Sequence, residues 1–303
     1  MNIETDGYIL KCEETEDGLK VTGYEGDGAI LDISEENKIT SIDKKVFLSC
    51  NQLRKVKLPD SITGIGDWCF SNCRNLDKVE ISSSSADGRI FGRGVFEACD
   101  RLSRISFSGT DMSTQVLLAA GVNRMSNELL LRADDIGQKF WYEKWDISLL
   151  SLLNSDDAES TISTAVSGEE DISYDGVAMV DGEMSGPTSD HVKNIAKNKS
   201  YLCYLRLLND SHLGRKTKDK IEEYIRSRAF GTENPSAWIT LKEDCEGDVE
   251  YYETYLSVVN PSRDEMMKMI EDLGPTRVQA KALLIDRARG DSSGNSVLDD
   301  LML

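Results

Sequence analysis

Two cysteines four residues apart, Cys69 and Cys73, are the first feature of this sequence that could do chemistry. Thiolates at short spacing can hold a zinc ion or form a redox pair. A zinc site would need further ligands, and the two histidines, His191 and His212, lie far away at no spacing typical of such sites. The elements that carry the two cysteines therefore decide between a reactive pair and ordinary core residues.

The two cysteines lie inside an internal repeat. Residues 39–61 align with residues 62–84 at a shift of 23, and nearly every apolar position matches. A third copy follows at residues 90–107 with three extra residues, and a partial copy precedes the first at residues 30–34. A repeat of this length is typical of a solenoid, in which neighbouring copies stack to bury a shared core.

The aligned columns explain the cysteines of this region. Cys73 shares its column with Cys50 and Cys99, and Cys69 falls in a column that the other copies fill with valine. A free cysteine packs as a small hydrophobic residue, and the odd total of seven argues against a disulfide framework. We therefore interpret Cys69 and Cys73 as core residues with free thiols; a metal or redox pair is the alternative.

Each copy is predicted to form one short strand and a short turn of helix. In the first copy Leu53, Val56 and Leu58 alternate as the inward side chains of a strand do, and residues 43–50 supply the opposite wall. One such unit cannot bury its apolar side alone, so at least three must stack and both ends need caps. The N-terminal cap is predicted to be a hairpin over residues 8–26 that turns at an Asp-Gly pair.

The full pattern of the first copy resembles a known family. Residues 39–59 read I-x-x-I-x-x-x-x-F-x-x-C-x-x-L-x-x-V-x-L-P, and this pattern resembles the BspA-type leucine-rich repeat. The resemblance extends over the first third of the chain, and the third copy departs from it with Phe91 in the second isoleucine column. It implies a short leucine-rich-repeat solenoid. It also implies protein binding or adhesion, often at bacterial surfaces, and generally no catalytic residues.

From residue 111 onward the spacing of apolar residues changes. They recur every three or four positions, which predicts packed helices over most of residues 112–154 and 191–289. Ser262 ahead of an acidic turn, followed by a Gly-Pro pair, predicts a helical hairpin near the C-terminus. The pairs of predicted helices loosely resemble ankyrin- or HEAT-like repeats, and an irregular bundle is the alternative.

An acidic segment divides the predicted helices. Residues 155–190 hold ten acidic residues and no lysine or arginine, which predicts a long solvated loop, with a short hairpin around residues 174–184. The predicted fold class is therefore α+β. A leucine-rich-repeat domain with an N-terminal hairpin cap occupies residues 1–109, and an α-helical domain occupies residues 110–303.

Charge and hydropathy exclude some classes of partner. The net charge of −19, with a pI of about 4.6, argues against binding to duplex DNA or to an anionic membrane, because both attract a basic face. No segment reaches the roughly 18 apolar residues of a membrane span, and the N-terminus has no signal-peptide pattern. We expect a cytoplasmic protein without a membrane span; an extracellular location, after removal of a leader, is the alternative.

The sequence contains none of the short motifs that mark common catalytic sites. It lacks a P-loop, an H-E-x-x-H pair, a G-x-S-x-G elbow and an EF-hand loop. Gly92 and Gly94 form a lone G-x-G inside a repeat turn, where the turn itself favours glycine. We therefore predict no enzymatic activity, no cofactor and no metal site.

The candidate binding residues are basic side chains at or beside outward positions of the repeat strands: Arg54, Lys55, Lys57, Lys78 and Arg104. Lys55, Lys78 and Arg104 fall in one column, which we call the basic stripe. Like charges on strands about 4.8 Å apart repel unless acidic groups lie opposite. We therefore predict that the stripe docks an acidic segment, either of a partner protein or of the chain's own acidic loop. The simpler alternative is three long side chains extended into water.

These inferences favour a non-catalytic module that binds another protein through the sheet face of the repeats, the helical surface or both. A bacterial surface or adhesion protein is the main alternative. An enzyme with a cleft in the helical domain is the third interpretation. Nothing in the composition points to a nucleic-acid partner.

Overall fold

The computed structural model divides the chain into two compact units, Met1–Ser148 and Leu149–Leu303, which we call the repeat unit and the helical unit. The structure describes residues 1–5, 7–82, 90–125, 128–131, 135–155, 157, 178–180, 183–185, 187–245 and 248–290. Within these ranges, none of the helices combines the length and apolar content needed to cross a bilayer.

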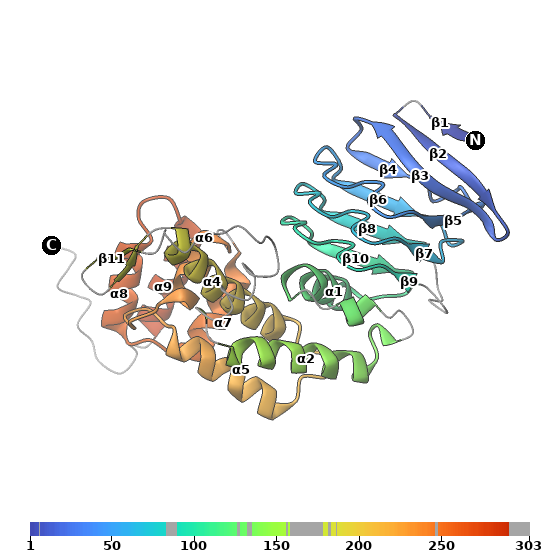
Figure 1. The fold of residues 1–303 in the computed structure, drawn as a ribbon. Coiled ribbons are helices and arrows are strands. Elements are labelled where there is room, and N and C mark those ends of the chain that lie inside the picture. The colour runs from blue at the N-terminus through green and yellow to red at the C-terminus, as the bar shows by residue number, and fades with distance from the viewer. Residues whose placement is uncertain are drawn as a thin grey trace. The chain divides into compact units, whose positions relative to one another are not determined.

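The repeats build two sheets, and successive coils add strands to both (Figure 1). The first sheet has the order β1-β2-β3-β5-β7-β9 and is parallel from β3 onward, whereas the second, β10-β8-β6-β4, is parallel throughout. The strands of the first sheet are β1 Asn2–Glu4, β2 Tyr8–Thr15, β3 Gly18–Gly26, β5 Ile39–Ile42, β7 Gly64–Ile65 and β9 Ile90–Phe91. Those of the second sheet are β4 Ile30–Asp32, β6 Lys55–Leu58, β8 Lys78–Ile81 and β10 Arg104–Phe107.

The prediction of one strand and a turn of helix per coil is wrong in one respect. The start of each copy is a second strand, and the segment between the two strands is a series of turns rather than a helix. Lys45 and Ser49 have left-handed backbone, with φ of 61° and 60°, which interrupts the hydrogen-bond ladder of a helix. The Phe47 amide instead donates to the Cys69 carbonyl of the next coil at 2.9 Å, and the same bond recurs one coil further along.

Buried aromatic rings form a column through the repeat unit. Phe47, Phe70 and Phe96 are fully buried, and their successive ring centroids lie 4.9 and 5.7 Å apart. Tyr24 of the N-terminal hairpin extends the column, with its centroid 4.9 Å from that of Phe47. Because one sequence position recurs in every coil, each ring completes the burial of the ring before it.

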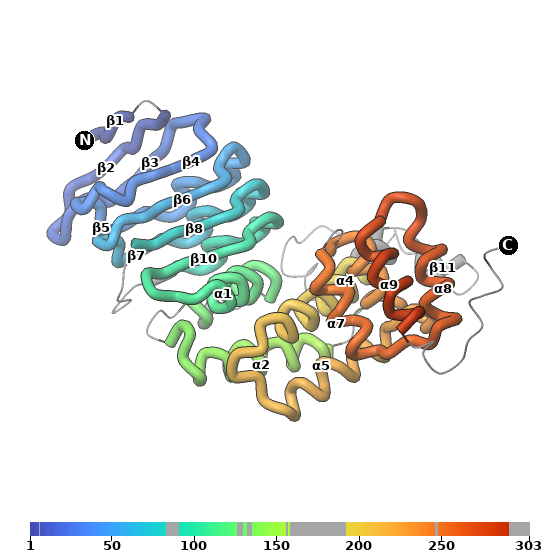
Figure 2. The backbone as a smooth tube through the Cα atoms, turned by 180° about the vertical axis from the view of Figure 1, so that it is seen from behind, coloured from blue at the N-terminus to red at the C-terminus, as the bar shows by residue number. Residues whose placement is uncertain are grey.

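Both ends of the coil stack are capped (Figure 2). At the N-terminal end β2 and β3 pair as an antiparallel hairpin, which confirms the predicted cap. At the other end helix α1 (Met112–Arg124) packs against β10. Asp111 starts this helix, because its Oδ1 accepts a hydrogen bond from the Thr114 amide at 2.7 Å.

Helix α2 (Lys139–Asn154) and the 3-10 helix η1 (Glu128–Leu131) complete the C-terminal cap of the repeats. The buried Trp145 donates from Nε1 to the Leu117 carbonyl of α1 at 2.8 Å, and the buried Trp141 donates to a carbonyl of η1 at 3.0 Å. The boundary between the two compact units falls within α2, whereas the predicted boundary marks the step from strands to helices. The predicted domain ranges stay a prediction.

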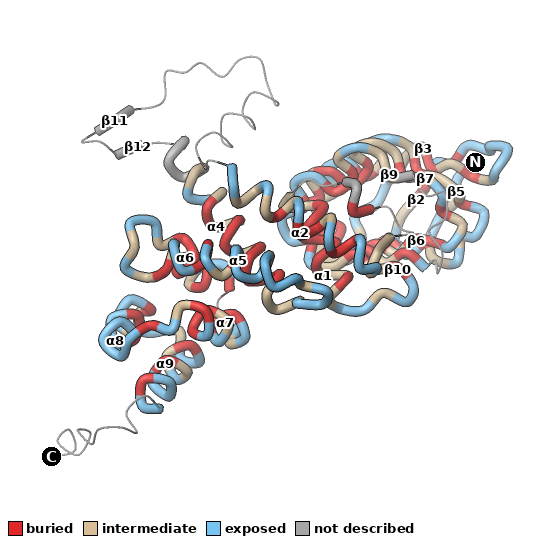
Figure 3. The backbone as a smooth tube through the Cα atoms, turned by 90° about the horizontal axis from the view of Figure 1, so that it is seen from below, coloured by how far each residue is buried: buried red, intermediate tan, exposed pale blue. Residues whose placement is uncertain are grey.

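Helix α4 (Pro187–Leu208) is the central helix of the helical unit. It packs against α5, α6 and α7, and its buried residues lie between Ala196 and Arg206 (Figure 3). The helices after it are α5 Arg215–Ser227, α6 Ser236–Glu243, α7 Val249–Val259, α8 Arg263–Asp272 and α9 Val278–Gly290. The helical prediction for this part is confirmed, while the loose resemblance to ankyrin- or HEAT-like repeats stays a prediction.

The predicted helical hairpin at the C-terminal end, α8 and α9, is confirmed. Ser262 forms a capping box with Glu265: the Ser262 amide donates to the Glu265 carboxylate at 2.8 Å, and the Glu265 amide donates to the Ser262 hydroxyl. This reciprocal pair fixes where α8 starts. The helix ends ahead of Gly274, whose φ of 67° suits glycine.

Only parts of the predicted acidic loop are described. Residues 158–177, its middle, lie outside the described residues. Strands β11 (Ala178–Val180) and β12 (Glu183–Ser185) pair antiparallel, which confirms the predicted short hairpin. Helix α4 begins at Pro187, so the predicted loop ends a few residues earlier than expected.

Candidate functional site

The cysteine pair that raised the question of chemistry belongs to the core. Cys69, Cys73 and Cys99 are fully buried with free thiols. The Cys73 thiol donates to the Phe47 carbonyl of the preceding coil at 3.1 Å, and the Cys99 thiol donates to the Phe70 carbonyl at the same distance. Among the described residues, no group of three or more histidines, cysteines or carboxylates is placed to hold a metal ion.

The buried thiols are expected to resist alkylation in the folded protein. Burial raises the pKa of Cys73 and of Cys99 to about 12 and also raises the pKa of Cys69, so these thiols stay protonated at pH 8. Cys50 is half-buried and should react first with iodoacetamide, whereas the buried cysteines should react only after unfolding. Mass spectrometry of labelled peptides measures the order; labelling of Cys69 as fast as Cys50 would contradict it.

The register of the second sheet brings the basic stripe together. Lys55 on β6 pairs with Lys78 on β8, and Lys78 pairs with Arg104 on β10. The exposed Ile30 of β4 begins the same column. All three cations are therefore neighbours on one face, as the aligned columns predict. We call the outward side of β4, β6, β8 and β10 the sheet face.

Acidic side chains at neighbouring positions neutralise part of this face. Lys55 Nζ lies 2.6 Å from Glu80 Oε1 on the adjacent strand, and Lys57 Nζ lies 2.6 Å from Asp32 Oδ2 on β4. The repulsion expected from a column of like charges is thus relieved by diagonal and direct pairs within the sheet. Sequence columns alone miss these pairs, because they compare equivalent positions and ignore diagonal neighbours.

Lys57 and Asp32 each stabilise the ionised form of the other. The hydrogen bond from Lys57, together with bonds from Ser34, lowers the pKa of Asp32, and the bond to Asp32 raises the pKa of Lys57. Both groups therefore stay ionised at neutral pH. Of the five candidate residues, Lys57 is the one most engaged within the face.

The remaining positive charge lies on three of the candidate residues. Among the described residues Lys78 pairs with Asp77 alone, at 3.5 Å, and Arg54 and Arg104 have no carboxylate partner. A pair between exposed side chains contributes at most about 1 kcal/mol. Lys55 and Lys78 can therefore exchange their present partners for those of a docking protein.

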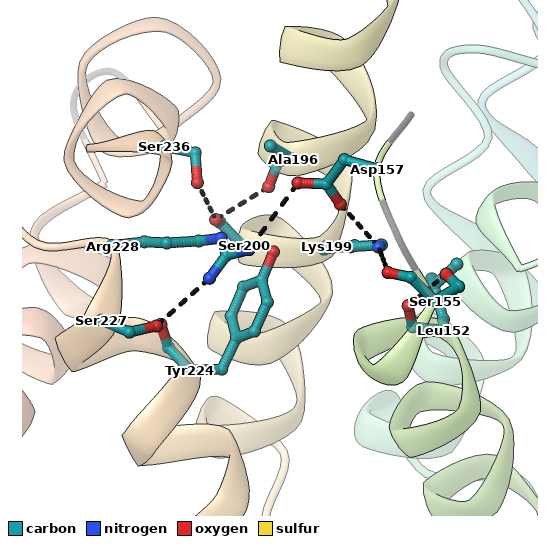
Figure 4. Close-up of polar contacts among 10 residues, drawn as sticks. All are labelled: Leu152, Ser155, Asp157, Ala196, Lys199, Ser200, Tyr224, Ser227, Arg228 and Ser236. Carbon is teal, nitrogen blue, oxygen red and sulfur yellow. Dashed lines mark hydrogen bonds and ion pairs between the residues drawn. The ribbon is translucent and has the colours of Figure 1, made fainter. Parts of the chain in front are cut away.

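The helical unit contains a buried polar cluster that sequence reasoning missed (Figure 4). The fully buried Lys199 donates from Nζ to Asp157 Oδ1 at 2.6 Å and to the Ser155 carbonyl at 2.7 Å. Arg228 Nη2 lies 3.7 Å from Asp157 Oδ2. The available signal was a lysine four residues before Cys203 in a largely apolar stretch, since this spacing places both on one helix face.

The arrangement of this cluster suits a tether rather than a catalytic centre. The Lys199 ammonium group is engaged by two oxygens of the segment that follows α2, and so ties that segment to α4. The guanidinium carbon of Arg228 lies 4.2 Å from the ring centroid of Tyr224, and burial raises the pKa of this phenol, which stays neutral. These charges act on one another inside the unit.

Comparison with known proteins agrees with the two-sheet coils. Residues 23–117 match the family described as BspA type leucine rich repeat region, in six copies. These residues form a BspA-type leucine-rich repeat region. The matched range begins in β3 and ends in α1, so the leucine-rich repeat region includes the sheet face and reaches into both caps. The resemblance inferred from the first copy is confirmed.

Part of the chain is also similar to a solved structure. The crystal structure of a leucine rich cell surface protein from Faecalibacterium prausnitzii is similar at 23% identity and a TM-score of 0.27. The similarity covers 35% of this chain and 30% of that protein, so it is confined to a part of each. The search of curated proteins gave no match. The match to the BspA-type repeat therefore concerns residues 23–117.

Proposed function

We propose that this chain is a non-catalytic module whose leucine-rich repeats bind a partner protein at the sheet face. The observation that carries the proposal is the basic stripe of Lys55, Lys78 and Arg104, on one face of a chain with a net charge of −19. Repeat solenoids present extended surfaces of stacked strands, which suit such binding. The family resemblance supports a binding role and generally no catalytic residues.

The charges favour a partner with an acidic docking segment. Arg54, Lys78 and Arg104 retain positive charge that the sheet does not neutralise. A segment with carboxylates at the spacing of neighbouring strands would complement them, and electrostatic complementarity raises both specificity and association rate. Binding should therefore weaken as ionic strength rises, because exposed charges are screened over about 10 Å at 0.1 M salt.

Charge reversal of the stripe tests the proposal. We expect Lys55→Glu/Lys78→Glu/Arg104→Glu to weaken partner binding on the order of 100-fold, because three attractions of up to about 1 kcal/mol each become repulsions. The matched control is Arg215→Glu/Lys216→Glu/Lys218→Glu, which makes the same change of charge at exposed positions of α5. Affinity capture from a lysate of the source bacterium, quantified by mass spectrometry, compares both variants with the wild type.

The two variants separate the possible outcomes. Partner loss with the stripe variant alone supports the sheet face, whereas loss with the α5 variant alone moves the binding surface to the helices. If neither variant changes the captured proteins, the stripe is solvated surface and the proposal fails. Faster proteolysis within residues 155–190 of the stripe variant would instead identify the chain's own acidic segment as the occupant.

A role at the bacterial surface is the second candidate. The BspA-type family is associated with bacterial surface proteins, which favours the extracellular alternative over the expected cytoplasmic location. Protease treatment of intact cells distinguishes the two. Degradation before lysis supports a surface protein that uses the same face for adhesion, and protection until lysis supports a cytoplasmic partner.

A further inference from the structure

Trp68 differs from the other tryptophans of the chain. It lies half-buried on the side of the coils between the two sheets, which we call the turn face (residues 43–50, 66–73 and 92–99). The other three tryptophans are at most 2% exposed. The Trp68 indole N–H has no hydrogen-bond partner among the described residues. A large aromatic group with an unused donor is therefore presented to solvent.

The backbone of Trp68 is an unusual one for a bulky residue. Its φ is 53°, in the left-handed region that L-residues with large side chains rarely occupy. The equivalent positions in the neighbouring coils are Lys45, with φ of 61°, and Gly94, with φ of 62°. Glycine adopts this conformation without strain. The coil therefore imposes this backbone at each copy, and glycine would be the least strained residue at position 68.

The next coil leaves room for the indole. A Cβ atom on Gly94 would lie 2.6 Å from both Cδ1 and Nε1 of Trp68, so any other residue at position 94 would displace the ring. Glycine is required at position 92 for a different reason, because a Cβ there would lie 2.4 Å from the Asp67 amide nitrogen. Both glycines of the lone G-x-G are thus explained by the close approach of the preceding coil. The absence of a side chain at Gly94 leaves the space that the Trp68 ring occupies.

Two cations from neighbouring coils flank the ring. Lys45 Nζ lies 5.3 Å from the ring centroid and the guanidinium carbon of Arg93 lies 4.6 Å from it. Among the described residues neither cation has a carboxylate partner, and the exposed Lys44 has none either. Leu48 on the same face is 42% exposed.

Among the described residues, the carboxylates of this face form no ion pair with Lys45 or Arg93. Asp43 accepts from the Lys44 amide and pairs with Lys20 at 3.1 Å. Asp67 accepts from the Arg93 amide at 2.8 Å. Glu97 is exposed, and its Oε2 borders the indole edge, because a Cβ on Gly94 would lie 2.9 Å from it and 2.6 Å from Trp68 Cδ1. Two cations and one carboxylate therefore surround the ring, with an excess of positive charge.

We propose that the turn face is a second docking site, centred on Trp68, for an acidic segment of a partner protein. Carboxylates of the segment would meet Lys45 and Arg93, and an apolar side chain would cover the indole edge and Leu48. Tryptophan and arginine are the residues most enriched at the energetic centres of protein interfaces, and a ring held in place by its neighbours loses little entropy on binding. This site shares no residue with the sheet face.

A fluorescence titration tests this site directly, because Trp68 is the half-buried tryptophan of the chain. The probe is a soluble peptide of Glu-Glu-Leu-Gly repeats, and its Gln-Gln-Leu-Gly counterpart is the control. We expect a saturable change in the exposed tryptophan emission with the acidic peptide only. Lys45→Gln/Arg93→Gln should weaken binding about tenfold or more, while the stripe variant of the sheet face should bind as the wild type does.

The same variants keep this proposal distinct from the proposed function. Loss of peptide binding in the stripe variant alone would place the acidic segment on the sheet face and overturn the turn-face site. An unchanged emission on addition of the acidic peptide, or equal binding by Lys45→Gln/Arg93→Gln, would overturn it as well.

Substitution of the tryptophan separates binding from stability. Trp68→Gly removes the ring and suits the left-handed backbone, so we expect loss of peptide binding with a melting temperature within a few degrees of the wild type. Ala98→Gly is the matched control, because Ala98 is exposed with φ of 52° and should keep full binding. A large fall in melting temperature with unchanged binding would show that the indole is structural.

Discussion

Replacement of Phe70 by alanine is expected to lower the free energy of unfolding of the repeat unit by about 3–5 kcal/mol. The ring is fully buried between Phe47 and Phe96, and it forms a near-parallel stack with each of them. Stacked pairs add about 0.5–1.5 kcal/mol each beyond area burial. The coils on both sides are held by inter-coil backbone bonds and cannot collapse into the space that the ring leaves. Urea denaturation followed by circular dichroism measures the loss.

Phe91→Ala is the matched control for this prediction. Phe91 is half-buried at the end of the first sheet and meets Phe107 edge-on, with centroids 6.2 Å apart. Its removal should cost about 1–2 kcal/mol, because less apolar area is lost and water can fill the site. Equal losses for Phe70→Ala and Phe91→Ala would contradict the stacked column as the main source of stability in the repeats.

The second large effect is expected at the buried ion pair of the helical unit. Lys199→Met should lower the free energy of unfolding by about 3 kcal/mol or more, because the Asp157 carboxylate loses the buried ammonium group that lies 2.6 Å from it. Lys199 itself is fully buried, so solvent cannot replace the lost partner. Thermal unfolding followed by the emission of the buried Trp238 reports on this unit.

Two further variants make the test specific. Lys197→Met removes a lysine two residues earlier, which pairs with Glu243 at 2.8 Å and Asp244 at 3.1 Å, and should cost less than Lys199→Met because both of these carboxylates are exposed to solvent. Lys199→Met/Asp157→Leu removes both charges of the close pair and should recover much of the loss, because Arg228, which loses Asp157 at 3.7 Å, is partly exposed to solvent. A loss for Lys199→Met no larger than that for Lys197→Met would contradict the tether.

The strands of the sheet face could be predicted from the sequence because their apolar residues repeat in register. Leu53, Val56 and Leu58 mark one strand, and the same columns recur in the next two copies. The first sheet could not be predicted in this way. Its parallel strands after β3 are two to four residues long, and their hydrogen bonds come from neighbouring coils rather than from local pattern.

The segment between the two strands of each coil was wrongly predicted to be a turn of helix, for a related reason. Its apolar spacing resembles a turn of helix, but Lys45 and Ser49 have positive φ, which no residue type at these positions indicates. The neighbouring Trp68 was missed as well, since its partners Lys45 and Arg93 belong to different copies. Contacts between copies depend on the width of each coil, and the repeat pattern contains no direct measure of that width.

The positions of the basic residues on the sheet face could be predicted from the sequence. The ion pairs that neutralise some of them could not. The column of Lys55, Lys78 and Arg104 is where the pattern indicates. The pairing of Lys55 with Glu80 was not foreseen, because it joins different columns on adjacent strands. The buried pair of Lys199 and Asp157 could not be predicted either. Asp157 stands in a long acidic run where no single carboxylate is distinguished by sequence.

Site-specific photo-crosslinking is the most direct test of the central claim, that the sheet face binds a partner protein. A photoreactive amino acid replaces Ser106, at an outward position of β10, and in a second protein replaces the exposed Thr63 beside the first sheet. The account predicts one partner adduct from position 106 in cells of the source bacterium and none from position 63. An adduct from position 63 alone, or equal yields from both positions, would contradict it.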